Sequence, residues 1–418
     1  MLRAALSMPF FDIPLNFALI RGSSMNYQKT IRACFIGYIV QAIVVNFAPL
    51  LFVQFQTQYG VPLSKIALLI TLNFGLQLLV DLVSAFIVDK IGYRIIGVLS
   101  HAFSAVGLIL LAFLPDLFSN PFLGMMIAMG IYAIGGGLLE VIISPMVEAC
   151  PSDNKNTAMS LLHSFYSWGS AGVILLSTLF FFLFGIENWK ILSVLWAIVP
   201  IVNGINFTRI PIAELDGGED GGLSLAGLFR SGLFWVFILI MCCAGASEQA
   251  VAQWASAFAE EGLQVSKTIG DLAGPTLFAI LMGLSRMLYG KYGEKLNQAH
   301  VMLASSVLCI LAYLIISLSA SPILGLIGIA LTGFSVGVLW PGALSMAAAR
   351  IRGGGTAMFA LMALAGDVGC AGGPTLAGNV AEAFSNNLRL GILSAIVFPV
   401  VLVAVMLFLQ KNKKAGEQ

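Results

Sequence analysis

Three carboxylic acids in the middle of long apolar segments are the side chains best suited to chemistry. Glu140, Glu248 and Asp367 each lie near the centre of such a segment. A carboxylate at the centre of a bilayer costs about 2.5 kcal/mol or more, so each one needs a function or a partner. Arg286 comes near the end of its segment, and His163 is the only central titratable nitrogen. We therefore predict proton coupling at the three acids; the alternative is a permanently protonated carboxyl bonded to a neighbouring helix.

Polar side chains recur at helical spacing around these acids and predict a shared cavity. Asn73, Gln77 and Asp81 follow one another every four residues, and so do Glu140 and Ser144, which places each set on one helix face. Amides and flat aromatic rings suit a neutral polyol, although a single amide can also simply bond two helices together. The predicted solute-binding residues are Tyr38, Gln41, Asn46, Asn73, Gln77, His163, Tyr166, Gln253, Trp254 and Trp340.

Membrane helices must position these residues, because the composition excludes a soluble protein. Of 418 residues, 59% are hydrophobic and 10% charged, against about 45–50% and about 25% in ordinary domains. The 21 basic and 20 acidic side chains leave no basic field for nucleic acid. We find no nucleotide-binding loop, no nucleophile elbow and no metal-ligand spacing, and so expect neither an enzyme nor a metal or cofactor.

Twelve apolar stretches, each near the length needed to cross a bilayer, predict an all-α polytopic protein. They lie near residues 31–54, 64–88, 94–114, 121–148, 157–184, 190–209, 231–258, 268–289, 297–319, 323–349, 355–381 and 389–410. One long polar interruption separates six stretches from six. We predict a poorly placed N-terminal arm (1–24), a six-helix bundle (25–210), a cytoplasmic linker (211–229), a second six-helix bundle (230–410) and a cytoplasmic tail (411–418).

The basic residues indicate the orientation. With the N-terminus in the cytoplasm, 17 of the 21 Lys and Arg fall on the cytoplasmic side or its border, as positive-inside topology requires. We therefore expect a multi-pass protein of the cell (inner) membrane with both termini and the linker in the cytoplasm.

The two halves of the chain repeat one another. Ser64-Lys65 returns as Ser266-Lys267 at an offset of 202, and Thr157-Ala158-Met159 returns as Thr356-Ala357-Met358 at an offset of 199. Both copies have the same orientation, as in transporters built from parallel repeats. Asn46 and Glu248 occupy matching positions, so we expect them to face each other.

The hairpin between the second and third stretches resembles the loop motif of the major facilitator superfamily. The matching residues are Asp89, Lys90, Gly92 and Arg94, while Ala85 and Tyr93 replace a glycine and a basic residue of the motif. The resemblance covers the chain from about residue 25. It implies two six-helix bundles that rock around a central cavity, and a gate role for the four matching residues. A solvated turn is the alternative.

The fourth and fifth stretches resemble the fucose permease branch of that superfamily. They carry Gly136-Gly137 followed by Glu140 and Pro145, and then His163 ahead of Trp168-Gly169. The resemblance implies that Glu140 is the essential carboxylate of the branch and that His163 fills its polar position in the next helix. Gln54-Phe55-Gln56 is also similar to a sequence at the end of the branch's first helix.

Two departures from the branch bear on ion coupling. Ser144 stands where Asn is usual, and the acid of the first helix is absent, with Pro49 near its place and Asn46 as the nearest polar side chain. Either Glu248 substitutes for that acid, or sodium replaces the proton.

We therefore expect a secondary transporter that moves a sugar or sugar-like polar solute by proton-coupled symport and alternating access. The alternatives are a proton antiporter that exports drugs or metabolites, and sodium-coupled or facilitative sugar transport. The expected partners are the solute, the proton or sodium, and the lipid bilayer. We expect a monomer that binds no nucleic acid.

Overall fold

The computed structural model describes residues 27–150, 155–212, 225–292, 296–351 and 355–416. In these residues all regular secondary structure is helical, which confirms the predicted all-α class. The predicted N-terminal arm (1–24) and most of the predicted linker (residues 213–224) lie outside the described part of the chain.

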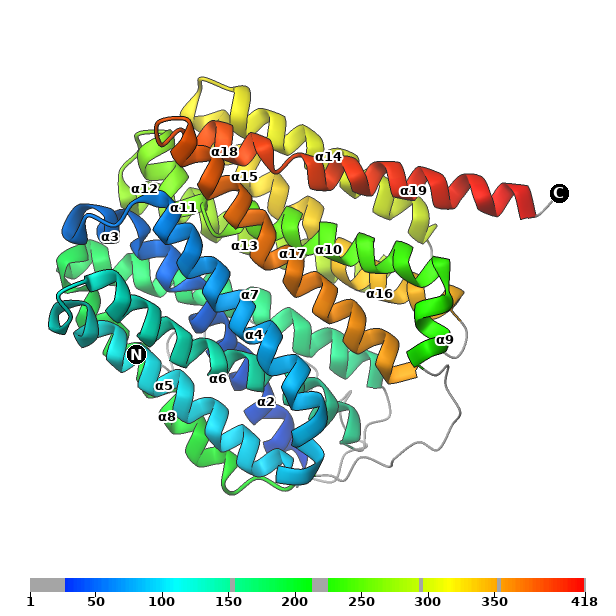
Figure 1. Cartoon of the computed structure of the whole chain (residues 1–418), viewed down its shortest axis with the longest axis horizontal. Coiled ribbons are helices and arrows are strands. Elements are labelled where there is room, and N and C mark those ends of the chain that lie inside the picture. Colours follow the sequence, from blue (N-terminus) through cyan, green and yellow to red (C-terminus); the bar gives the residue numbers. More distant parts are fainter. Residues whose placement is uncertain (1–26, 151–154, 213–224, 293–295, 352–354, 417–418) are drawn as a thin grey trace.

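The first half of the chain forms one bundle, coloured blue to green in Figure 1. Its elements are α2 (Tyr27–Asn46), η3 (Ala48–Leu51), α3 (Phe52–Tyr59), α4 (Leu63–Ile91), α5 (Tyr93–Leu117), α6 (Pro121–Ala149), α7 (Lys155–Phe184), η4 (Ile186–Asn188) and α8 (Trp189–Phe207). Within this N-terminal bundle α5 packs on α6 and α8, α4 on α6, and α2 on α7.

The second half forms a C-terminal bundle, coloured green to red (Figure 1). Its elements are α9 (Leu225–Arg230), α10 (Gly232–Ala252), α11 (Ala255–Ala257), η5 (Phe258–Gly262), α12 (Lys267–Asp271), η6 (Leu272–Thr276), α13 (Leu277–Tyr292), α14 (Gln298–Leu318), α15 (Pro322–Val336), α16 (Leu339–Arg350), α17 (Gly355–Ala383), α18 (Leu388–Ser394) and α19 (Val397–Gly416). α8 ends and α10 begins on one side of the bundles, which we call the linker side; the opposite side is the far side.

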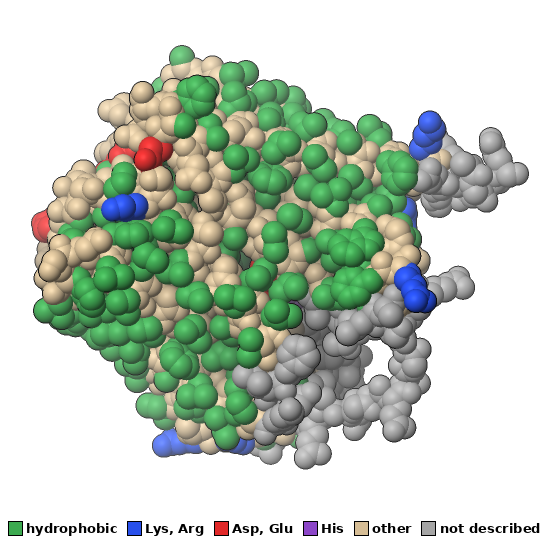
Figure 2. All heavy atoms as spheres, viewed as in Figure 1, with side chains coloured by type: hydrophobic (Ala, Val, Ile, Leu, Met, Phe, Trp, Pro, Cys, Tyr) green, Lys and Arg blue, Asp and Glu red, His purple; other side chains and the backbone are tan. Residues whose placement is uncertain are grey.

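Among the described residues, eleven helical segments are long and apolar enough to cross a membrane. The 29-residue α17, packed against α10 and α4, is a further long helix and completes a set consistent with the twelve predicted spans. Figure 2 shows one face of the molecule, where apolar side chains predominate and the few charged side chains lie near its margins. The chain is therefore a multi-pass membrane protein.

The first and seventh spans are interrupted beyond their centres, toward the far side. α2 ends at Asn46, just before Pro49, and α10 ends at Ala252, before a turn at Gln253 and Trp254. Interrupted helices are a common source of binding sites in transporters, because side chains and backbone groups at the break turn toward the interior.

The bundles meet along two seams, α4 with α17 and α7 with α13. On the far side Gln56 donates a hydrogen bond to Glu261 at 3.1 Å, and Thr178 donates one to Asp271 at 3.3 Å. The backbone N–H of Ser64 also bonds the carboxylate of Glu382. These contacts hold the far side of the two bundles together.

Candidate functional site

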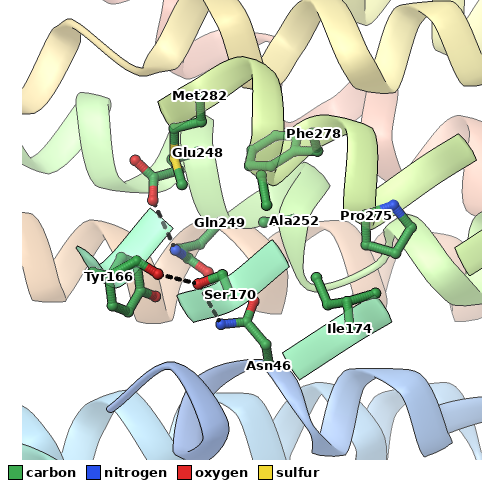
Figure 3. A pocket seen from close by; sticks show the side chains of 11 residues that line it. Asn46, Tyr166, Ser170, Ile174, Glu248, Gln249, Ala252, Pro275, Phe278 and Met282 are labelled. Atoms are coloured by element: carbon green, nitrogen blue, oxygen red, sulfur yellow. Dashed lines mark hydrogen bonds between the residues drawn. The ribbon is translucent and has the colours of Figure 1, made fainter. Parts of the chain in front are cut away.

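A small cavity lies between the bundles at the interrupted helices (Figure 3). It is lined by Asn46, Tyr166, Ser170, Ile174, Glu248, Gln249, Ala252, Pro275, Phe278, Ala279 and Met282. Asn46 from α2 and Glu248 from α10, which the repeat places at matching positions, both line this space. The cavity is lined by two amides, a carboxyl group and several apolar and aromatic side chains. This composition is usual for a small-molecule binding site.

Glu248 has a basic partner, contrary to the sequence-based interpretation. Its carboxylate lies 3.4 Å from the guanidinium of Arg286, and both side chains are largely buried, at 10% and 15% exposed. Gln249 also donates a hydrogen bond to Glu248 at 3.2 Å. The sequence-based interpretation placed Arg286 near the end of its segment and assigned Glu248 no basic partner, and the ion pair corrects the second point.

Arg286 is a site residue that the sequence reasoning missed. The eighth span was expected to end near residue 289, but α13 continues to Tyr292 after the π-turn at η6. Arg286 thus lies six residues, or about 9 Å, from the helix end, and its long side chain extends inward. It bonds Ser167 of α7 at 2.9 Å and the carbonyl of Gly337 at 3.2 Å, so it connects the two bundles.

Glu140 belongs to a network of amides on three helices. The amide of Gln41 (α2) donates to Gln77 (α4) at 2.7 Å and to the carboxylate of Glu140 (α6) at 3.3 Å. No Lys or Arg among the described residues forms an ion pair with Glu140. Within the described part of the chain, Glu140 is therefore bonded by the Gln41 amide without an ion pair, whereas Glu248 has both an amide bond and an ion pair.

Two glycines allow these three helices to come close together. A Cβ on Gly136 would lie 2.8 Å from the side-chain oxygen of Gln41, and one on Gly137 would lie 3.0 Å from the backbone of Gln77. The Gly136-Gly137 pair therefore serves to bring Glu140 within reach of the amides.

Aromatic side chains extend this network toward α7. Tyr38 shares a hydrogen bond with Ser144 at 3.1 Å, and its ring centroid lies 5.5 Å from that of His163 and 6.4 Å from that of Tyr166. The side chain of His163 is exposed at the surface of the folded chain, whereas Tyr38 is buried. Of these three predicted binding residues, Tyr166 lines the cavity, whereas Tyr38 and His163 are not among its lining residues.

Other predicted binding residues bond neighbouring helices. Asn46 donates to Ser170 on α7 at 3.0 Å, and Gln253 donates to the carbonyl of Val45 across the bundles at 3.5 Å. Asn73 is buried, and its side-chain oxygen has no hydrogen-bond partner among the described residues.

The two predicted tryptophans lie outside the cavity wall. Trp254 is fully buried, and its N–H donates to the carbonyl of Pro374 at 2.9 Å. Trp340 is half-buried and lies over Gly366 of α17, where a Cβ would come within 2.3 Å of its ring. In this conformation both rings pack against neighbouring helices, and their role in solute binding stays a prediction.

The described residues of the loop motif after α4 make their contacts within the N-terminal bundle in this conformation. Gly92 has a φ of +90° and ends α4. Arg94 donates to the carbonyls of Phe207, Thr208 and Ile210 at 3.1, 2.8 and 2.9 Å, so it closes the end of α8. The side chains of Asp89 and Lys90 lie outside the described part, and their predicted gate role stays a prediction.

Sequence and structure comparisons define the class of protein to which this site belongs. The sequence matches the Major Facilitator Superfamily over residues 34–374 and 272–418. The chain belongs to this family of membrane transporters. No curated protein sequence matches the chain.

Two solved structures share the fold. A bacterial homologue of the human lysosomal transporter Spinster, solved in an inward-facing and occupied conformation, has a TM-score of 0.75 at 15% identity, and the match covers 93% of this chain and 98% of that one. A single-residue variant of the Escherichia coli fucose:proton symporter FucP has a TM-score of 0.62 at 14% identity, and the match covers 92% and 99%. At these identities the similarity shows the fold alone.

Proposed function

We propose that this transporter moves a sugar or sugar-like small polar solute together with a proton, by alternating access of its two bundles. Glu140 is the coupling acid, and Glu248 with Arg286 forms a second charged centre between the bundles. The fucose:proton symporter among the structural neighbours shares this fold, which supports the same class of activity here.

The observation that carries the proposal is the setting of Glu140. It is a carboxyl within a membrane helix, bonded by an amide and without an ion-pair partner among the described residues. A carboxyl with no fixed cation can take up a proton when water reaches it and release it on the other side. Glu248, paired with Arg286 at 3.4 Å, has less freedom to do so.

The polar groups near the cavity favour an uncharged, hydroxyl-rich solute. Asn46, Gln249 and Tyr166 line the cavity, and Gln41 and Gln77 lie by Glu140. Amides offer both donors and acceptors, so they can bond hydroxyl groups in either sense. Arg286 is already bonded to Glu248 and Ser167, and no Lys or Arg is among the described residues that line the cavity, which disfavours an anionic solute.

The test uses purified protein in proteoliposomes and begins with a thermal-shift panel of sugars, polyols and nucleosides. Uptake of any hit is then measured with the outside more acidic than the inside. For one proton per solute, a difference of one pH unit supports about tenfold accumulation. Glu140→Gln should lose this accumulation and keep solute exchange at equal pH, because the amide preserves the shape of the site but carries no exchangeable charge.

Glu187→Gln is the matched control, since Glu187 lies in the short η4 segment on the far side and should transport as the wild type does. Full accumulation by Glu140→Gln would contradict the coupling role. Uptake that depends on a sodium gradient, or efflux of lipophilic cations against a pH gradient, would replace proton symport with one of the alternatives.

A further inference from the structure

The cavity between the bundles has a polar end and an apolar end (Figure 3). Along α7, the lining residues Tyr166 and Ser170 are followed one turn later by Ile174, on the same helix face. Along α10, Glu248 is followed one turn later by Ala252. Both helices run toward the far side, so the lining changes from polar to apolar in that direction.

The wall that η6 and α13 contribute is apolar throughout. Its lining residues are Pro275, Phe278, Ala279 and Met282. In Figure 3, Phe278 and Pro275 lie with Ile174 at one end of the cavity, and Met282 lies by the polar end. A solute with hydroxyl groups on every side would have to press some of them against this wall, where they would lose their hydrogen bonds to water without replacement.

The polar end has little hydrogen-bonding capacity to spare. The amide of Asn46 donates to Ser170 at 3.0 Å and to a carbonyl of its own helix at 2.9 Å, and Gln249 donates to Glu248 at 3.2 Å. Among the described residues, none bonds the hydroxyl of Tyr166, which is therefore open to a solute. This end can hold one polar head, but it cannot surround a solute with hydroxyl partners.

We propose that the solute is amphipathic: a hydroxyl-bearing head that carries a small apolar substituent, as in an alkyl glycoside. The head lies by Tyr166 and Asn46, and the substituent lies against Ile174, Pro275 and Phe278. This inference rests on the proposed function and names the substrate class of the same site. The walls come from both bundles, so rocking of the bundles widens the small cavity for the solute and leaves the chemistry of each wall unchanged.

The test measures equilibrium binding to the full chain in lipid nanodiscs, without a pH gradient and without alkyl-glycoside detergents, which would compete. The probes are the free sugar and the methyl, ethyl, propyl and butyl glycosides of glucose, galactose and mannose, and of any further sugar that the thermal-shift panel selects. Each buried methylene should tighten binding severalfold. The butyl glycoside should therefore bind roughly tenfold or more tightly than the methyl glycoside of the same head.

Three variants locate the two ends of the solute. Ile174→Thr and Ala279→Ser each place a hydroxyl in the apolar wall with little change in size. Each should lower the ratio of butyl to methyl affinity by about threefold and keep methyl glycoside binding, which also shows that the variant is folded. Tyr166→Phe should weaken every probe by the same factor, about fivefold, and leave the ratio unchanged. Glu187→Gln should match the wild type throughout.

Affinities that are undetectable, flat or falling from methyl to butyl for every head would overturn the proposal. A ratio that survives in both wall variants would also overturn it, because the alkyl group would then be bound elsewhere. The expected ratios without proton movement would remove symport and leave this inference standing. Proton-driven accumulation of a free sugar, with no gain from an alkyl group, would do the reverse.

Discussion

At the scale of single residues, the pairing of Glu248 with Arg286 makes a sharp stability prediction. Both side chains are largely buried, and removing one partner of a buried pair leaves an uncompensated charge. Arg286→Met should lower the free energy of unfolding by about 3 kcal/mol. Glu248→Gln should cost less, because Arg286 keeps its bonds to Ser167 and Gly337.

The double variant with both substitutions should recover most of the stability that Arg286→Met loses, since no charge is left unpaired. This double-mutant cycle is measured by the unfolding midpoints of the wild type, the two single variants and the double variant in one detergent. Equal midpoints for Arg286→Met and the wild type would show that the pair contributes nothing.

Residue types and spacing were enough to pick out Glu140, Glu248 and Asp367, because acids in apolar segments are rare. Residue types and spacing were not enough to find the side chains that contact these acids. Arg286 was missed because a shift of a few residues at a helix end decides whether a long side chain reaches water or the interior.

At the scale of elements, α10 and α17 pack through glycines that position Asp367. A Cβ on Gly369 would lie 1.9 Å from the carbonyl oxygen of Cys242, and one on Gly373 would lie 2.4 Å from that of Ala246. Small residues at such crossings let membrane helices approach closely.

Gly369→Ala should therefore force α10 and α17 apart and destabilise the protein by about 1–3 kcal/mol. Gly372→Ala is the matched control on the same helix, because a Cβ there meets nothing within 4 Å, and it should be neutral or slightly stabilising. Thermal unfolding of the two variants measures the difference. Equal unfolding midpoints for the two variants would contradict the view that Gly369 allows α10 and α17 to pack closely.

Hydropathy alone located every described span, since twenty apolar residues can hardly be anything else in this composition. It did not reveal the interruptions at Gln253-Trp254 or the π-turn at Leu272–Thr276. A break in a buried helix is set by packing and by proline placement, and the apolar character continues straight through it.

At the scale of the whole molecule, the positive-inside pattern predicts that the linker side faces the cytoplasm. The six native cysteines are buried or half-buried, so a new exposed cysteine can be labelled selectively. Ser119→Cys lies on the far side and Leu296→Cys on the linker side, and both positions are exposed.

In intact cells, a membrane-impermeant maleimide should label Ser119→Cys, and it should label Leu296→Cys only after permeabilisation. The reverse pattern would invert the topology. With the predicted topology, the hydrogen bonds on the far side close the outer face of the transporter.

The repeat in the sequence predicted that Asn46 and Glu248 would face each other; both line the same cavity, where Asn46 bonds Ser170 and Glu248 pairs with Arg286. The repeat predicted this because duplicated bundles place equivalent positions around a common axis. The repeat does not predict which side of the two bundles is closed, because a transporter that works by alternating access adopts two conformations with one sequence.

Coupled movement of solute and proton is most directly measured with a pH-sensitive dye inside proteoliposomes. Adding solute outside at equal pH should acidify the interior for the wild type and for Glu187→Gln, and should leave it unchanged for Glu140→Gln. Alkalinisation of the interior, or solute uptake with no pH change, would contradict proton symport.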